Sequence, residues 1–240
     1  MRRLIPFFLA LLVAPAFAGQ VQVAVAANFA QPMQKIAAAF EHDTGHKAVV
    51  AVGSTGRFYA QVRNGAPFQV LLAADDETPA RLVKENYAVA GTAFTYATGR
   101  LALWSVQPGL VDAKGDVLRH PPAGARLAIA DPKLAPYGAA AMQALQRLGV
   151  LAQWQSRIVQ GESIGQAYQF VASGNAALGL VALSQVDRAS AWVVPADLHA
   201  PLKQDAVLLL PGRDQPAALA LLHYLRSDAA RAVIRGYGYE

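Results

Sequence analysis

Short apolar segments of strand length alternate with segments of helical periodicity from Gln20 almost to the end of the chain. The first unit, QVQVAVAANF, has an apolar run typical of a buried strand, and the run stops at Asn28, where a helical pattern begins. Strands and helices that alternate in this way predict an α/β fold with parallel strands and right-handed crossovers. In such folds, ligands bind at the carboxyl ends of the strands. The junctions between strands and helices are therefore candidate sites.

Four of these junctions carry neutral hydrogen-bonding groups where the helix is expected to begin. They hold Asn28, the pair Ser54 and Thr55, Tyr137 in front of Gly138, and the pair Ser163 and Ile164. Backbone N–H groups at a helix start have no partner within the helix, and they bind anions without a cationic side chain. If the four junctions converge, they form a nest of uncharged donors that selects a dehydrated oxyanion by geometry and protonation state.

A purely structural interpretation exists for each of these residues. Asn, Ser and Thr at a helix start usually serve as N-caps, and this interpretation is favoured for any single position. Tyr137 alone fits a turn between Pro136 and Gly138, and Ile164 alone fits a core position. Only the set of four junctions favours a ligand site.

Other patterns that could carry chemistry are weaker. His42 and His46 have a spacing suited to metal binding on one helix, but Thr44-Gly45 should end the helix between them, which favours a solvated turn. The GSTG segment after the second strand has neither a nucleophile elbow nor the Gly-Lys-Ser/Thr ending of a phosphate-binding loop. No motif in the sequence therefore supports an enzymatic function.

The first 18 residues have the pattern of a signal peptide. Arg2 and Arg3 precede an apolar run, and Ala16-Phe17-Ala18 matches the small-residue pattern of a cleavage site. We expect an exported mature chain that begins near Gly19, and no later stretch approaches the ~20 apolar residues of a membrane span. The sequence has no cysteine, which excludes disulfides, thiolate metal sites and a lipid-anchored product. A bacterial periplasm is the simplest compartment.

The charge pattern argues against a nucleic-acid partner. The formal net charge is +5, and two of the basic residues belong to the predicted leader. Lys and Arg are scattered singly along the chain, as is typical of solvated surface, and form no basic stripe. The chain also lacks repeats and low-complexity segments, which argues against a structural or adhesive protein.

The four junctions, in this order and behind a signal peptide, resemble the periplasmic molybdate-binding proteins of ABC transporters. The resemblance covers essentially the whole mature chain and is carried by VAVAANF, VGSTGRFYAQVRNGAPFQVLLAAD, LAIADPKLAPYGAAAMQALQRLG, GESIGQAYQFVASGNAALGLVALSQ and the terminal RGYGY. It implies a type II periplasmic-binding-protein fold, with two α/β lobes that each contain a mostly parallel sheet flanked by helices. Lobe one would comprise residues 19–98 and 205–240, lobe two residues 99–204, and the ligand would lie in the cleft between them.

The same resemblance implies which residues contact the ligand. It places the contacts on Asn28, Ser54, Thr55, Tyr137 and Ile164, with backbone N–H groups as the donors of the last two. Many family members have a contacting tyrosine where Ala182 stands here, so the Asn28 amide is expected to supply the missing donor. The resemblance implies no cofactor, no catalytic residue and no direct bond between protein and metal, because molybdenum is bound as the oxyanion.

The resemblance further implies a monomer that captures molybdate, and tungstate comparably, and delivers it to an inner-membrane ABC permease after hinge closure. Phosphate is disfavoured, since its protonated form calls for an acceptor and no acid lies at the junctions. The alternatives are another oxyanion such as sulfate, or a small carboxylate held by Arg57. An exported enzyme that uses Asp75 or His120 is an alternative of a different class.

Overall fold

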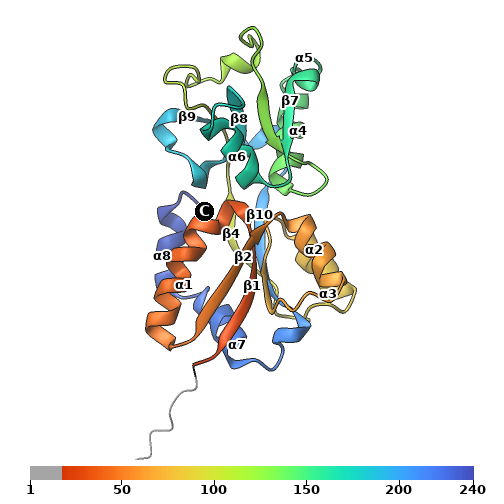
Figure 1. The fold of residues 1–240 in the computed structure, drawn as a ribbon, viewed down its shortest axis with the longest axis vertical. Coiled ribbons are helices and arrows are strands. Elements are labelled where there is room, and N and C mark those ends of the chain that lie inside the picture. The colour runs from red at the N-terminus through yellow and green to blue at the C-terminus, as the bar shows by residue number, and fades with distance from the viewer. Residues whose placement is uncertain (1–17) are drawn as a thin grey trace, which may run out of the picture.

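A computed structural model describes residues 18–240, so nearly all of the predicted signal peptide lies outside the described residues. The chain forms two α/β lobes stacked along the long axis of the molecule (Figure 1). Each lobe is built on one five-stranded sheet. The predicted two-lobed fold class is confirmed by this architecture. Among residues 18–240, no helix has the length and apolar character needed to cross a bilayer.

The sheet of the first lobe has the strand order β2-β1-β3-β10-β4. Its strands are Gln20–Ala26 (β1), Lys47–Gly53 (β2), Val70–Leu72 (β3), Phe94–Gly99 (β4) and Leu202–Leu208 (β10). Strand β1 pairs in parallel with β2 and β3, whereas β10 runs antiparallel to β3 and β4. The sheet is therefore mixed, because the chain returns through β10 after building the other lobe.

Helices cover both faces of this sheet, which explains why β1 is a nearly continuous apolar run. Its valines Val21, Val23 and Val25 pack in one fully buried cluster with residues of α1 (Ala30–Thr44), α7 (Pro216–Tyr224) and α8 (Asp228–Gly236). The small Ala24 belongs to a second cluster on the opposite face, with residues of α2 (Thr55–Arg63) and α3 (Glu77–Lys84). The first turn after β1 is a 3₁₀ turn at Ala27–Phe29, so α1 begins two residues later than predicted.

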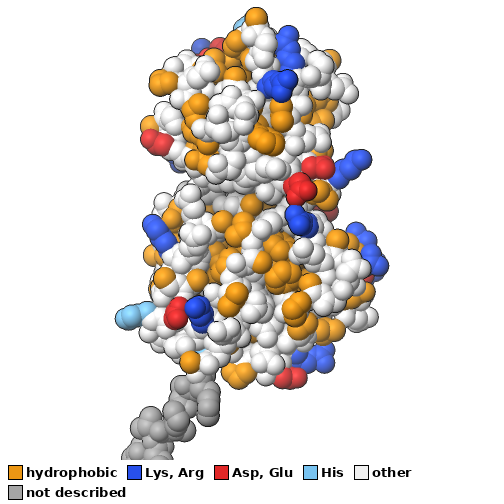
Figure 2. All heavy atoms as spheres, in the orientation of Figure 1, with side chains coloured by type: hydrophobic (Ala, Val, Ile, Leu, Met, Phe, Trp, Pro, Cys, Tyr) orange, Lys and Arg blue, Asp and Glu red, His pale blue; other side chains and the backbone are white. Residues whose placement is uncertain are grey.

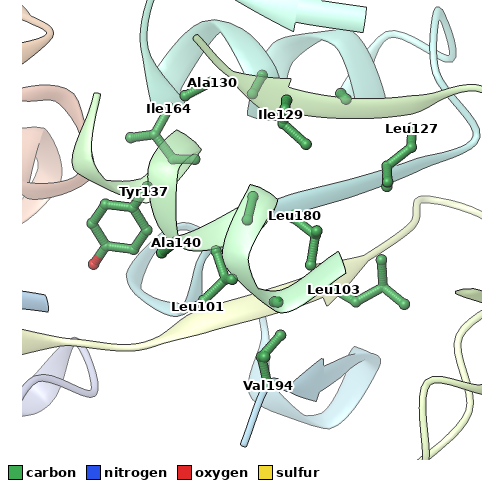
Figure 3. Packing of buried hydrophobic residues seen from close by; sticks show 14 of the residues in the cluster. Leu101, Leu103, Leu127, Ile129, Ala130, Tyr137, Ala140, Ile164, Leu180 and Val194 are labelled. Carbon is green, nitrogen blue, oxygen red and sulfur yellow. The ribbon is translucent and has the colours of Figure 1, made fainter. Parts of the chain in front are cut away.

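The sheet of the second lobe has the strand order β7-β6-β8-β5-β9. Its strands are Leu101–Trp104 (β5), Leu127–Ala130 (β6), Ile158–Gly161 (β7), Leu178–Ala182 (β8) and Ala191–Val193 (β9). The helices are α4 (Pro136–Arg147), α5 (Leu151–Trp154) and α6 (Ile164–Ala172). Figure 3 shows Leu101, Leu103 and Leu180 of the sheet packed with Ala140 of α4 in the core of this lobe.

The chain crosses between the sheets at two places. The first crossing lies between Gly99 and Leu101, and the second between Val193 and Leu202. The carboxyl end of the chain lies beside the first crossing: the N–H of Thr98 donates to the carbonyl of Glu240 at 2.7 Å, and the reverse bond measures 3.1 Å. Both crossings and the chain end thus meet between the lobes.

Two elements near the carboxyl end differ in extent from their local sequence patterns. The helical pattern from Pro216 to about Arg235 forms two helices, because Ser227 accepts a hydrogen bond from the N–H of Ala230 and caps a new helix there. The apolar run that starts at Ala206 predicts a strand there, but the strand begins at Leu202. Its partner β4 was not predicted, because its pairing with β10 joins residues far apart in the sequence.

Candidate functional site

The five residues predicted to bind a ligand line one small cavity between the lobes. The space left in it is about 10 Å³, roughly what a single water molecule needs. Its lining consists of Asn28, Ser54, Thr55, Tyr137 and Ile164 together with Ala26, Ala27, Gly53, Ala74, Ala135 and Pro136. Pockets for drug-sized ligands span about 300 to 1,000 Å³, so this cavity has room only for a very small ligand such as an inorganic ion. That these residues bind a ligand remains a prediction.

The cavity is walled by helix starts from both lobes. In the first lobe, Ser54 has an extended backbone and α2 begins at Thr55. In the second lobe, α4 begins at Pro136 and α6 at Ile164. Within residues 18–240, the N–H groups of Tyr137 and Ile164 donate to no protein acceptor, as expected for the first turn of a helix. Each helix start therefore presents a free backbone donor and the positive end of its dipole.

The serines before α2 and α6 differ in the use of their hydroxyl groups. Ser163 is an N-cap, since its Oγ accepts a hydrogen bond from the N–H of Gln166 at 3.3 Å. Ser54 makes no cap bond, and its Oγ is buried without a partner among residues 18–240. Because buried polar atoms are nearly always paired, the free Oγ of Ser54 indicates a group that a ligand would satisfy.

The hydroxyl of Thr55 is oriented as a donor. Its Oγ1 accepts a hydrogen bond from the N–H of Ala74 at 2.9 Å. The hydroxyl hydrogen is left available, because a threonine hydroxyl has one hydrogen to donate and two lone pairs to accept with. The pair Ser54 and Thr55 thus supplies two neutral hydroxyl groups to the same wall.

No basic side chain belongs to the cavity lining described here. Arg57, the counter-charge of the carboxylate hypothesis, is 58% exposed and pairs across the lobes with Glu162, with Nη1 2.9 Å from Oε2. The other candidate residues also lie elsewhere. The carboxylate of Asp75 accepts hydrogen bonds from the N–H and hydroxyl of Thr78, although burial raises its pKa. His120 is an exposed surface residue.

The metal hypothesis for His42 and His46 is not supported by their contacts. The helix ends at Gly45, as predicted, with a left-handed φ of 72°. Nδ1 of His42 lies 2.8 Å from the carboxylate of Asp43, whereas Nδ1 of His46 accepts from the N–H of Gly19. Among residues 18–240, no three His, Cys, Asp or Glu side chains are grouped to hold a metal ion.

A buried polar network surrounds Asn28 and was missed by the sequence analysis. Nδ2 of Asn28 donates to Oε1 of Gln204 at 2.8 Å and to the hydroxyl of Tyr239 at 3.0 Å. The carbonyl of Asn28 accepts from the hydroxyl groups of Tyr239 and Ser184, at 2.8 and 2.9 Å. Burial raises the pKa of the Tyr239 phenol, which therefore stays neutral.

This network engages the side chains of two of the predicted site residues, Asn28 and Tyr137. The expectation that the Asn28 amide supplies the donor missing at Ala182 stays a prediction. In this structure both of its amide hydrogens are donated to Gln204 and Tyr239. A phenol does reach Asn28, from the chain end at Tyr239 rather than from β8. The Tyr137 hydroxyl accepts from Nε2 of Gln204 at 3.2 Å, and Figure 3 shows it pointing away from the core of its lobe. The backbone N–H of Tyr137 is therefore the group that this residue offers to a ligand in the cavity.

Known proteins similar to this chain include molybdate-binding proteins. Residues 21–240 match the family described as bacterial extracellular solute-binding protein. The molybdate-binding protein ModA of Azotobacter vinelandii is 56% identical over 235 residues, which cover 95% of this chain and 93% of that protein. ModA of Rhodobacter capsulatus is 51% identical over 228 residues, which cover 94% and 90%.

Solved structures agree with these sequence matches. The Azotobacter vinelandii periplasmic molybdate-binding protein has a TM-score of 0.87 and 39% identity, and the match covers 92% of this chain and 98% of that one. The sulfate-binding protein SubI of Mycobacterium tuberculosis has a TM-score of 0.69 at 14% identity, covering 92% and 86%. This second likeness shows a shared fold alone, so the fold by itself does not select the anion.

Proposed function

Because the chain belongs to the bacterial extracellular solute-binding proteins, in the group of the molybdate-binding proteins, we propose that it captures molybdate between its lobes for an ABC transporter. Like these relatives, it is a binding protein and not an enzyme. The observation that carries the proposal is a cavity walled by neutral donors from both lobes, in which the Oγ of Ser54 is buried and unpaired.

The neutral donors explain how a dianion is held without a cation. Charge-assisted hydrogen bonds from the hydroxyl groups of Ser54 and Thr55 and from the N–H groups of Tyr137 and Ile164 would surround a tetrahedral oxyanion. Each helix start adds about 0.3 to 1 kcal/mol of dipole stabilisation, and more in a buried site. Burial without water strengthens each of these interactions.

The ligand would also hold the lobes together, since its donors come from both. We place the hinge at the two crossings. The expected division into lobe one, 19–98 with 205–240, and lobe two, 99–204, then shifts by one and three residues, because β4 extends to Gly99 and β10 begins at Leu202. Molybdate stabilises the closed form because only that form brings all donors together. The closed monomer is then the form that an inner-membrane permease would recognise in the periplasm.

Calorimetric titration of the ligand-free protein tests the proposal. Molybdate and tungstate should bind tightly and comparably, because the two tetrahedral dianions are nearly the same size. Sulfate should bind more weakly because it is smaller, and phosphate because no carboxylate lines the cavity to accept its proton. Sulfate or phosphate binding as tight as that of molybdate would contradict the assignment.

Arg57→Ala is the matched test of the carboxylate alternative. Arg57 is paired with Glu162 at the surface, so its removal should leave molybdate affinity nearly unchanged. A loss of binding in this variant would instead assign Arg57 to the ligand.

A further inference from the structure

Gln204 is a buried amide at the centre of the network around Asn28. It lies on β10 with none of its surface exposed, at a register shift between β10 and β4. Its Oε1 accepts from Nδ2 of Asn28 at 2.8 Å and lies 3.1 Å from the hydroxyl of Tyr96, whose single hydrogen it shares with the carbonyl of Ala73. Its Nε2 donates to the hydroxyl of Tyr137 at 3.2 Å. One side chain therefore contacts two residues of the cavity lining.

In this arrangement, the Asn28 amide is unsuited to an oxyanion. Both hydrogens of Nδ2 are donated within the protein, to Gln204 and Tyr239. The remaining amide atom, Oδ1, is buried and has no partner among residues 18–240. Oδ1 can only accept, and a fully deprotonated oxyanion can only accept as well. Asn28 lines the cavity, so its amide has to present nitrogen before it can stabilise such a ligand.

A half-turn of the two amide groups exchanges donors and acceptors and keeps the network paired. Nε2 of Gln204 then donates to Oδ1 of Asn28 and to the hydroxyl of Tyr96, which itself donates to a backbone carbonyl. The hydroxyl of Tyr137 donates to Oε1 of Gln204. The hydroxyl of Tyr239 turns its single hydrogen from the backbone carbonyl of Asn28 to Oδ1 of Asn28, and that carbonyl still accepts from the hydroxyl of Ser184. Each of these groups can take either role. Nδ2 of Asn28 becomes free to donate to the ligand.

We propose that Gln204 is a positioning residue that sets the orientation of the Asn28 amide and thereby the preference of the site for a fully deprotonated oxyanion. Gln204 acts through Asn28, since it is not part of the cavity lining. The network is also confined: a Cβ at Gly99 would overlap the hydroxyl of Tyr137 and approach Nε2 of Gln204. On this side, the Gln204 amide packs directly against the backbone of Gly99. This inference rests on the proposed function.

A double-mutant cycle tests this role. Gln204→Met keeps the length of the side chain but removes its donor and acceptor, so molybdate affinity should fall about 10-fold or more. In an Asn28→Ala background, the same change should cost less than about 2-fold, because Gln204 then has no amide to orient. Gln160→Met, on the exposed side of β7, is the matched control and should leave affinity unchanged.

The outcomes separate this inference from the proposed function. Wild-type protein is titrated first, and failure to bind molybdate there would refute the function itself. Wild-type binding with equal losses from Gln204→Met in both backgrounds would overturn the role of Gln204 alone.

A second measurement needs no folded variant of Gln204. In ¹⁵N-labelled wild-type protein, the side-chain amide signals of Asn28 and Gln204 should both shift when molybdate is added, because both groups exchange partners. Shifts confined to backbone signals such as that of Ile164, with the two side-chain amides unmoved, would overturn the proposal.

Discussion

At the scale of single residues, Ser54 and Ser163 occupy equivalent positions in their junctions, but only the hydroxyl of Ser163 caps its helix, whereas that of Ser54 has no partner among residues 18–240. Ser54→Ala should weaken molybdate binding by roughly 1 to 3 kcal/mol, because part of a buried anion loses its donor. Its stability without ligand should hardly change, since the hydroxyl has no protein partner among residues 18–240. Calorimetric titration and denaturant unfolding of the ligand-free protein measure the two quantities.

Ser163→Ala is the matched comparison for Ser54→Ala. It removes the cap of α6 and should lower the free energy of unfolding by about 1 kcal/mol. Its loss of affinity should be smaller than that of Ser54→Ala. Equal effects of both changes on affinity and stability would show that Ser54 is an ordinary cap.

These residues also mark how far the sequence could predict the site. Ser54 and Thr55 were predictable because a hydroxyl pair at a strand-to-helix junction is a local pattern. Whether a given serine caps its helix was not predictable, since Ser54 and Ser163 look alike in sequence. Gln204 carried no signal at all: it stands between Lys203 and Asp205 in a segment that looks solvent-exposed, and only tertiary packing buries it.

At the scale of elements, the segment after α8 inserts the Tyr239 phenol beside Asn28. Burial raises the folded-state pKa of Tyr239 above its ordinary value near 10. The neutral phenol therefore stabilises the fold fully below pH 10, and this stabilisation is lost as pH rises toward the folded-state pKa. Above pH 10, Tyr239 should lower the free energy of unfolding by about 1.4 kcal/mol per pH unit.

Tyr239→Phe provides the measurement of this effect. Denaturant unfolding of both proteins at pH 8, 10 and 11 should show the wild type more stable at pH 8 and its advantage shrinking above pH 10. Parallel stability curves for the two proteins across this range would mean that Tyr239 ionises as freely in the fold as in the unfolded chain.

Sequence patterns predicted elements well where contacts are local and poorly where they are distant. The periodicity of β1 and α1 is decided by neighbouring residues, and both elements formed close to their predicted bounds. Strands β4 and β10 pair with each other across the whole second lobe, so neither extent could be predicted from its own segment. The break between α7 and α8 depends on one cap at Ser227 inside an otherwise continuous helical pattern.

At the scale of the whole molecule, the lobes touch through backbone beside the cavity. The N–H of Gly56 donates to the carbonyl of Leu134 at 2.8 Å, and a Cβ at Gly56 would lie only 3.0 Å from that oxygen. Gly56→Ala should hold the lobes slightly apart and weaken molybdate binding, mainly through faster dissociation. The ligand-free variant should be as stable as the wild type or more so, because alanine favours the helix.

Gly236→Ala is the control for this prediction. Gly236 is also helical, and a Cβ there would meet no atom within 4 Å, so this change should leave binding rates unaltered. Stopped-flow measurement of molybdate dissociation compares the two variants. Unchanged dissociation from Gly56→Ala would show that the contact with Leu134 adapts without cost.

The position of the chain ends has a practical consequence for producing the protein. Glu240 is bonded to Thr98 through backbone and to Arg100 through an ion pair of 2.7 Å, so the last residue is fastened to the first crossing. An affinity tag or fluorescent fusion placed after Glu240 would emerge between the lobes, beside the first crossing. Strand β1 begins at the end of the molecule farthest from the second lobe (Figure 1). Figure 2 shows the lobes meeting at a waist far from that end. Labels, tethers and surface attachment therefore belong near Gln20, at the start of β1.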